Sequence, residues 1–314
     1  MSTIRSLELS DRPTIETFLQ RYPPEISELT FSNLFVWRNS RPICFAEVDD
    51  SIVFVVNPAK DGAKQKVVFG QPVGEASPLA VASSLDVQVA GFVRIGGQAA
   101  DPMREAGLHV EADRDNADYV YRTTDLAELS GRRLHKKRNL VKQCLSAYPC
   151  EYEPIIPELI DECSEMQDRW CKAKECGRNP GLCDEYIAIR ETFSHYQDLK
   201  LIGGAIRIDG IIQAYSIAEE LSPCTAVCHF EKAMPEFRGL SQLVNQWLAK
   251  FALSEFEFVN REQDLGIRGL RQAKESYYPN HMVHKFNAWF PSASPDMTQV
   301  VEPHRCDKDD VLKV

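Results

Sequence analysis

Apolar and polar residues follow one another in the first half of the chain in short runs that predict strands and helices in turn. Two β-prone runs, Ile43–Val48 and Ile52–Val56, flank an acidic pair, which is typical of a β-hairpin. Helices are predicted at Pro78–Leu85 and Pro102–Ala106, and a last strand at Asp118–Arg122. The first half therefore has the pattern of a mixed α+β domain.

The second half repeats this pattern at larger size. Its clearest signal is the pair Asp209–Gly210 between two apolar runs, since Asp-Gly supplies the positive φ angles of a type I′ hairpin turn. Apolar residues at helical spacing between Leu240 and Phe251 predict a strongly amphipathic helix. The other predicted elements are strands at 205–208, 211–217, 227–233, 256–259 and 282–289, and a helix at 267–276.

The two predicted hairpins share the form strand, acidic turn, strand, and the elements around them follow in the same order. This repetition indicates an internal duplication. We therefore predict an α+β fold of two domains with mixed sheets covered by helices. The expected bounds are 1–125 for a mainly structural N-terminal domain, 126–290 for a C-terminal domain with the ligand site, and 291–314 for a polar tail.

The composition adds few constraints. The 314 residues are 44% hydrophobic and 26% charged, as in ordinary globular proteins. No run of eighteen apolar residues predicts a membrane span, and the first ten residues lack the apolar core of a signal peptide, so we expect a cytoplasmic protein. The ten cysteines include no Cys-x-x-Cys pair, and reduced, packed thiols without a bound metal are the expectation.

One basic segment stands out in a chain of net charge −10, which otherwise argues against general binding of nucleic acid. Residues 132–142 carry six Lys and Arg residues and no acid. On a helix Lys136, Lys137 and Arg138 either meet an anion or form a solvated face balanced by neighbouring acids. Arg138 falls in line with an apolar stripe, so we expect it to be partly buried against an acidic partner.

A second polar cluster lies around a predicted strand and the helix after it. His229 and Glu231 share one face of the strand and are the candidate bases. Arg238 and Gly239 stand at the start of the helix, where free backbone N–H groups and the helix dipole suit a phosphate or carboxylate. The alternative is a flexible helix start with an outward arginine.

A third cluster follows the next predicted strand. Asn260, Glu262 and Asp264 come between this strand and a helix, and the end of a strand is a common ligand site in α/β layers. We expect these side chains to contact a ligand. Capping of the following helix is the alternative for Asp264.

Three segments carry a resemblance to a known family: residues 119–139, 229–233 and 260–279. They are similar to hallmark segments of uncharacterised bacterial proteins related to the C-terminal domain of phosphatidylglycerol lysyltransferase. The resemblance implies two tandem acyltransferase folds of the GNAT type. The turn at 236–241 matches only part of the glycine-rich loop by which acetyltransferases hold coenzyme A. Signatures of P-loop nucleotide hydrolysis, dinucleotide binding, serine hydrolysis and zinc proteolysis are absent from the sequence.

The resemblance implies an acyl- or aminoacyltransferase that acts on an amine or hydroxyl acceptor. Acyl-CoA or aminoacyl-tRNA is then the donor, and a small molecule or a lipid headgroup is the acceptor. Glu231 is the first candidate base and His229 the second. The donor's anionic groups would contact Lys136, Lys137, Arg138, Arg238 and Gly239, and the acceptor would be positioned by Asn260, Glu262 and Asp264. A non-catalytic protein of the same fold that binds an anionic ligand or tRNA is the alternative.

Overall fold

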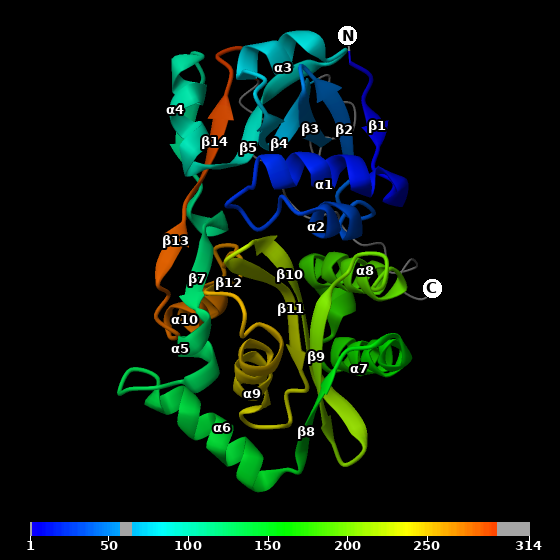
Figure 1. Cartoon of the computed structure of the whole chain (residues 1–314), viewed down its shortest axis with the longest axis vertical. Helices are drawn as coiled ribbons and strands as arrows, with labels where there is room; N and C mark the ends of the chain where they lie inside the picture. The colour runs from blue at the N-terminus through cyan, green and yellow to red at the C-terminus, as the bar shows by residue number, and fades with distance from the viewer. Residues whose placement is uncertain (1, 57–64, 294–314) are drawn as a thin grey trace. The chain divides into compact units, whose positions relative to one another are not determined.

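The computed structural model describes residues 2–56 and 65–293. Within these ranges the chain forms two compact units, residues 2–118 with 283–293 and residues 119–282 (Figure 1). Each unit is built on one seven-stranded mixed sheet. This confirms the predicted α+β class. The predicted tail, apart from residues 291–293, lies outside the described ranges.

The first sheet has the strand order β1-β2-β3-β4-β5-β14-β6. Its only parallel pair among the described strands is β4 with β5. The strands are β1 (Arg5–Ser6), β2 (Ile43–Val48), β3 (Ser51–Val56), β4 (Gln65–Gly74), β5 (Gln88–Gly96), β6 (His109–Ala112) and β14 (Lys285–Trp289). The helices are α1 (Arg12–Arg21), α2 (Phe31–Val36), α3 (Pro78–Ser84) and α4 (Gly97–Glu105), with short 3₁₀ turns at Leu9–Asp11 and Arg114–Asn116.

The core of the first unit lies on both faces of this sheet. Val53 and Val55 of β3 pack in one cluster with Val81 of α3 and Met103 of α4. Residues that alternate with them along β3, such as Phe54, face the other side, and α1 contacts β3 and β4. A strand buried on both faces explains why β3 is apolar at every position after its first residue.

The second sheet has the order β13-β7-β12-β11-β10-β9-β8. Its strands are β7 (Asp118–Arg122), β8 (Cys150–Pro154), β9 (Ile202–Ile208), β10 (Ile211–Ser222), β11 (Thr225–Ala233), β12 (Phe258–Asn260) and β13 (His281–Val283). The helices are α5 (Thr123–Glu128), α6 (His135–Ala147), α7 (Ile160–Ala173), α8 (Pro180–Ser194), α9 (Leu240–Trp247) and α10 (Arg268–Glu275), with 3₁₀ turns at Pro157–Leu159 and Cys176–Arg178 and a π-helical turn at Leu248–Ala252.

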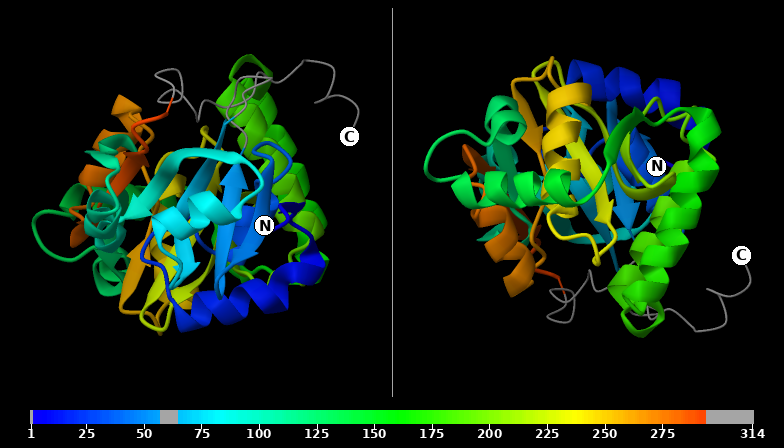
Figure 2. Two further views of the ribbon diagram at one scale, coloured as in Figure 1. Left: turned by 90° about the horizontal axis from the view of Figure 1, so that it is seen from above. Right: turned by 90° about the horizontal axis from the view of Figure 1, so that it is seen from below.

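Helices cover both faces of the second sheet, as Figure 2 shows from below. On one face α9 and α6 share a core with the small residues Ala214 and Ala218 of β10. On the other face Tyr215 of β10 packs against Phe193 of α8, and its hydroxyl donates to Gln167 of α7. The sheet therefore lies between two helical layers, as predicted.

The two halves of the chain contain the same elements in the same order, which supports the predicted duplication. β1 to β7 with α1 to α4 correspond one by one to β8 to β14 with α7 to α10, and α5 and α6 form the connection between the halves. Both hairpins have two-residue turns with positive φ: 42° and 55° at Asp49 and Asp50, and 50° and 80° at Asp209 and Gly210. In both sheets the fourth and fifth corresponding strands are the parallel pair.

The last strand of each half lies in the sheet of the other half. β7, which ends the first half, pairs with β12 in the second sheet, and β14, which ends the second half, lies between β5 and β6 in the first. The expected single closing strand at 282–289 was therefore wrong: it is two strands in two sheets. The observed division after Asp118 differs from the expected boundary at 125/126 for the same reason.

Buried charges in the first unit hold the first residue of each exchanged strand. The Lys285 ammonium lies 2.6 Å from Asp118 and also donates to Glu28, and these three side chains are fully buried. Arg94 pairs with the other oxygen of Glu28 at 2.8 Å. Burial by itself raises the pKa of Glu28, but Lys285 and Arg94 outweigh burial and lower this pKa to about 2.

We predict that Lys285→Met destabilises the protein by about 3–5 kcal/mol, because it leaves the buried carboxylate of Asp118 without its cation and Glu28 with Arg94 alone. Unfolding in urea measures this change. The matched control is Arg104→Met, which breaks the exposed pair with Asp101 and should cost less than about 1 kcal/mol. Equal stabilities of the two variants would contradict the prediction.

The strand exchange predicts that neither half folds alone. A chain split in the exposed connection between Ser130 and Gly131 yields fragments that each lack one strand of their own sheet. Separately expressed, each fragment leaves two strand edges unpaired and should aggregate. Co-expressed, the two should purify as one complex, as measured by affinity capture of a tag on one fragment. A cooperative unfolding transition from either isolated fragment as a monomer would refute this.

Candidate functional site

The parallel strands β11 and β12 of the second unit are paired over a short length only. Their register runs from Thr225 with Phe258 to Val227 with Asn260, whereas β11 continues to Ala233. A β-bulge at His229 interrupts the pairing of β11 with β10, because Cys228 and Phe230 lie opposite consecutive residues of β10. Bulges bend a strand and redirect its side chains. The polar residues of the second and third sequence clusters gather around this stretch.

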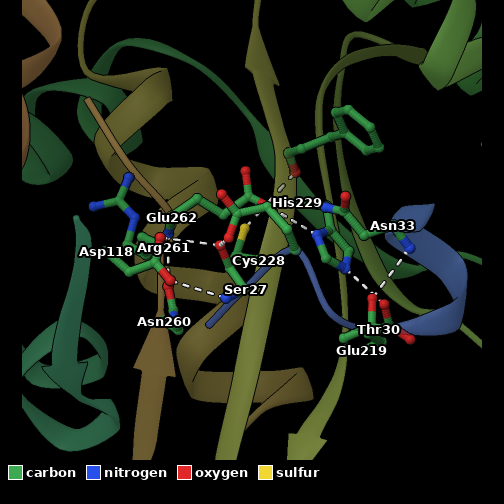
Figure 3. A network of polar contacts seen from close by, with 12 residues as sticks. Ser27, Thr30, Asn33, Asp118, Glu219, Cys228, His229, Asn260, Arg261 and Glu262 are labelled. Atoms are coloured by element: carbon green, nitrogen blue, oxygen red, sulfur yellow. Dashed lines mark hydrogen bonds and ion pairs between the residues drawn. The ribbon is translucent and has the colours of Figure 1, made fainter. Parts of the chain in front are cut away.

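His229 lies between two carboxylates, as Figure 3 shows. Its Nε2 is 2.7 Å from Glu219 of β10, and its Nδ1 is 2.7 Å from Glu262, in the loop after β12. Burial favours the neutral imidazole and lowers the pKa of His229, but the hydrogen bonds and charges of the two glutamates outweigh it and raise this pKa to about 10. At neutral pH His229 is therefore a cation that donates from both nitrogens.

Glu231 lies two residues further along β11 and belongs to a separate network. One of its oxygens accepts a hydrogen bond of 3.0 Å from Arg261, and the other accepts one of 2.9 Å from the Asn245 amide on α9. These partners come from the loop after β12 and from the helix that covers this face of the sheet. Glu231 of β11 therefore connects helix α9 with the loop that follows β12.

Arg261 is enclosed by aromatic rings. Its guanidinium lies 5.7 Å from the centre of the Tyr121 ring and 4.9 Å from that of Tyr277. Burial lowers the pKa of Arg261, but Glu231, Tyr121, Tyr277 and Cys228 together raise it above its ordinary value, so the side chain stays charged. Its Nη1 atom is buried and has no hydrogen-bond partner among the described residues. This nitrogen is a charged hydrogen-bond donor that can bind an acceptor group of a ligand.

Lys137 of the basic helix reaches the same aromatic ring. Its Nζ lies 4.3 Å from the centre of the Tyr277 ring. Partial burial and the nearby positive charge of Arg261 lower the pKa of Lys137, while Glu231 acts in the opposite direction. Two cations therefore share one carboxylate, which leaves a local excess of positive charge suited to an anion or a carbonyl oxygen.

The other two candidates of the basic helix lie differently. Lys136 is exposed. Arg138 is half-buried, as expected, but its guanidinium donates to the backbone carbonyls of Leu129 and Gly131 and not to an acidic partner. The prediction of an acidic partner for Arg138 was therefore wrong. Its hydrogen bonds connect the start of α6 with the preceding turn.

Gly239 has a packing role at the start of α9. Its φ is 87°, and a Cβ atom there would lie 2.2 Å from the carbonyl oxygen of Leu140 on α6. The backbone N–H groups of Leu240 and Leu243 donate to backbone carbonyls of this same turn. Arg238 beside it is exposed. Anion binding by Arg238 and Gly239 stays a prediction, and the glycine is explained by the close approach of two helices.

The third sequence cluster forms a closed loop. The Asn260 side chain accepts from the N–H of Glu262, as in an Asx turn. Asp264 is fully buried and accepts from the Tyr119 hydroxyl and, bidentately, from Arg271. The Lys274 ammonium donates to the carbonyls of the same loop. These side chains hold Arg261 in place, and their predicted contact with an acceptor is not tested by this arrangement.

The structure thus brings together Glu231 and Lys137, and separately His229 and Glu262. Sequence reasoning missed Arg261, Asn245 and Tyr121. A usable signal existed for Arg261, since it is a cation directly after a buried strand, inside a run already singled out for its acids. Asn245 carried no such signal, because it stands among the apolar residues of an amphipathic helix.

Comparison with known proteins shows the family to which the chain belongs. The model of the family "Phosphatidylglycerol lysyltransferase, C-terminal" matches residues 19–289. The chain belongs to the phosphatidylglycerol lysyltransferase C-terminal family. No curated protein matches the sequence significantly.

Solved structures of similar fold accompany this family match. A conserved protein of unknown function from Bacteroides thetaiotaomicron is 30% identical, with 92% of this chain and 100% of that one covered and a TM-score of 0.83. L-PGS from Bacillus licheniformis is 14% identical, with coverages of 94% and 96% and a TM-score of 0.67. The C-terminal domain of a putative lysylphosphatidylglycerol synthetase from Agrobacterium fabrum is also 14% identical, with coverages of 90% and 92% and a TM-score of 0.61. The predicted fold of two tandem GNAT-like units is confirmed.

Three further observations concern membranes, metals and thiols. Within residues 2–56 and 65–293, no helix has the length and apolar character needed to cross a bilayer. The same residues contain no group of three or more His, Cys, Asp or Glu side chains placed to hold a metal ion. The nine cysteines in the described ranges are free thiols, and Cys144 and Cys150 approach each other with sulfur atoms 3.9 Å apart.

The pKa of His229 predicts a specific pH dependence. A raised pKa means that folding stabilises the protonated form, so this contribution is complete below about pH 6.5, the value of a free imidazole. It should be lost as the pH rises through about 10. Urea unfolding between pH 6.5 and 10 should show stability falling for the wild type. His229→Gln should have a flatter profile in this window, and identical slopes would contradict the prediction.

Proposed function

We propose that this member of the family transfers an acyl or aminoacyl group to an amine or hydroxyl acceptor, with the reacting groups in the second unit. Family membership and the GNAT-like fold support transfer chemistry of this class. The family's name, phosphatidylglycerol lysyltransferase, favours aminoacyl transfer. The resemblance to GNAT-type acyltransferases makes acyl-CoA the second donor to test.

The single observation that carries the proposal is the buried Nη1 of Arg261, which has no acceptor among the described residues. Acyl transfer develops negative charge on the carbonyl oxygen, and donors of both kinds carry phosphates. A charged donor that is fixed in place before the reaction stabilises such an oxygen without reorganisation. Glu231 holds the other side of the guanidinium, and Tyr121 and Tyr277 keep it between their rings.

The other candidates take the following proposed roles. Glu231 uses two of its roughly four lone-pair sites on Arg261 and Asn245, which leaves acceptor capacity for a proton from the substrate amine. His229 is already protonated at neutral pH, so we assign it to holding the loop of Glu262 and not to proton abstraction. Lys137, with Lys136, Arg138, Arg238 and Gly239, is proposed to face the donor's anionic part, and Asn260, Glu262 and Asp264 to shape the acceptor side.

One observation favours the alternative of a non-catalytic binding protein. Both candidate bases are engaged: His229 is bonded at both nitrogens, and each oxygen of Glu231 already accepts a hydrogen bond. An anionic ligand or tRNA could then bind beside Arg261 and Lys137 without reacting. Turnover decides between the two functions.

We predict that Arg261→Gln lowers kcat/KM for transfer by about 10²–10³, the usual effect of removing one preorganised donor to an oxyanion. The assay follows labelled aminoacyl groups from aminoacyl-tRNA, or acyl groups from acyl-CoA, to amine and lipid-headgroup acceptors. Arg122→Gln is the matched control, because Arg122 lies in the same unit but pairs with Glu257 at an exposed position. It should react like the wild type.

Two outcomes would contradict the proposal. Wild-type protein that binds tRNA or coenzyme A but transfers nothing would establish the binding alternative. Arg261→Gln with undiminished transfer and an intact fold would remove Arg261 from the reaction.

A further inference from the structure

Two further polar atoms near Glu231 are buried without a partner. The Ser216 hydroxyl of β10 and the side-chain oxygen of Asn245 have no hydrogen-bond partner among the described residues. Ser216 is 0% exposed and Asn245 2% exposed, so neither side chain contacts bulk water. A buried acceptor that is left unpaired costs free energy, and such atoms in native proteins call for an explanation.

The orientation of the Asn245 amide is fixed by Glu231. Its Nδ2 donates to a carboxylate oxygen, which can only accept. A flipped amide would place two acceptor oxygens against each other. The Oδ1 of Asn245 is therefore directed away from Glu231 and can be satisfied only by a donor.

The sheet places Ser216 beside this group. Ser216 and Glu231 are direct partners in the antiparallel register of β10 and β11, so their side chains lie on the same face of the sheet. Asn245 approaches that face from α9 through Glu231. On the other side Ser216 pairs with Gly204 of β9.

The neighbouring residue over Gly204 is Tyr152. A Cβ atom on Gly204 would lie 2.4 Å from the Tyr152 hydroxyl, and this hydroxyl is also buried without a partner among the described residues. β8, β10 and α9 thus each carry, on this face of the sheet, a buried oxygen without a partner in the described part of the chain. Arg261 supplies the complementary cationic donor there.

We infer that Asn245 is a specificity-determining residue that, with Ser216, selects a substrate group bearing an N–H donor, an amine or an amide nitrogen. This inference rests on the proposed function, in which Arg261 binds the carbonyl oxygen of the transferred group. The selected N–H group would lie next to that carbonyl. The group either belongs to the donor, as the amino group of an aminoacyl ester, or is the acceptor amine. A plain acyl group has no donor, and a hydroxyl has one where an ammonium has three, so a hydroxyl satisfies only one of the two unpaired oxygens.

The experiment compares ligands that differ in their N–H group, by calorimetry on the whole chain. Alanine methyl ester against methyl propionate, which has no N–H, tests the donor side, and ethanolamine against choline, which keeps the charge but has no N–H, tests the acceptor side. The wild type should prefer the N–H ligand of one pair by about tenfold or more. Asn245→Leu should reduce this preference to about twofold or less, whereas Gln272→Leu, an exposed amide in the same unit, should leave it unchanged.

A second variant covers the case in which Asn245→Leu does not fold. Ser216→Ala removes only an unpaired buried hydroxyl, so it should raise the melting temperature of the free protein while it weakens the preference. Equal affinities within both pairs in the wild type, no measurable binding of either amine, or a preference that survives in both variants would overturn the inference. Transfer is assayed in parallel. A wild type that prefers the N–H ligand but transfers nothing would reject the proposed function and leave the selection of the N–H group intact.

Discussion

The exchange of terminal strands between the two halves is the constraint on which the rest of the molecule depends. Each sheet needs one strand from the other half of the chain to be continuous. In the first sheet β14 lies between β5 and β6, and in the second β7 lies between β12 and β13. The first residues of these strands, Lys285 and Asp118, form a buried ion pair in the first unit. The first positions of the two exchanged strands thus carry opposite charges and pair with each other.

The same exchange supplies the walls of the candidate site. β7 brings Tyr121 against the Arg261 guanidinium and Tyr119 to the Asp264 carboxylate. Both tyrosines precede the connection between the halves, whereas Arg261, Glu231 and Asn245 follow it. The polar cluster of the second unit is therefore encoded on both sides of the connection, and the strand that carries Tyr121 is fixed by its pairing with β12.

Local signals accounted for most of the elements and few of the contacts. The Asp-Gly turn, the helical period from Leu240 and the strand before Asn260 are properties of neighbouring residues, and the structure has them where expected. The destination of residues 285–289 is a long-range choice between two similar sheets, and strand period does not distinguish them. The roles of Asp264 and Arg138 were likewise out of reach, because burial among particular partners is set by the tertiary fold. The segment containing Glu231 was found, but its partner Asn245 looked like any polar residue on a helix.

The strand exchange also has a consequence for the order in which the chain can fold during synthesis. The ribosome delivers β1 to β6 early, but their sheet lacks its sixth member until Trp289 has emerged. β7, in turn, leaves the ribosome before any strand that it will pair with in the second sheet. A nascent chain therefore has neither sheet complete until residues 281–289 have left the ribosome, so the two sheets are completed together.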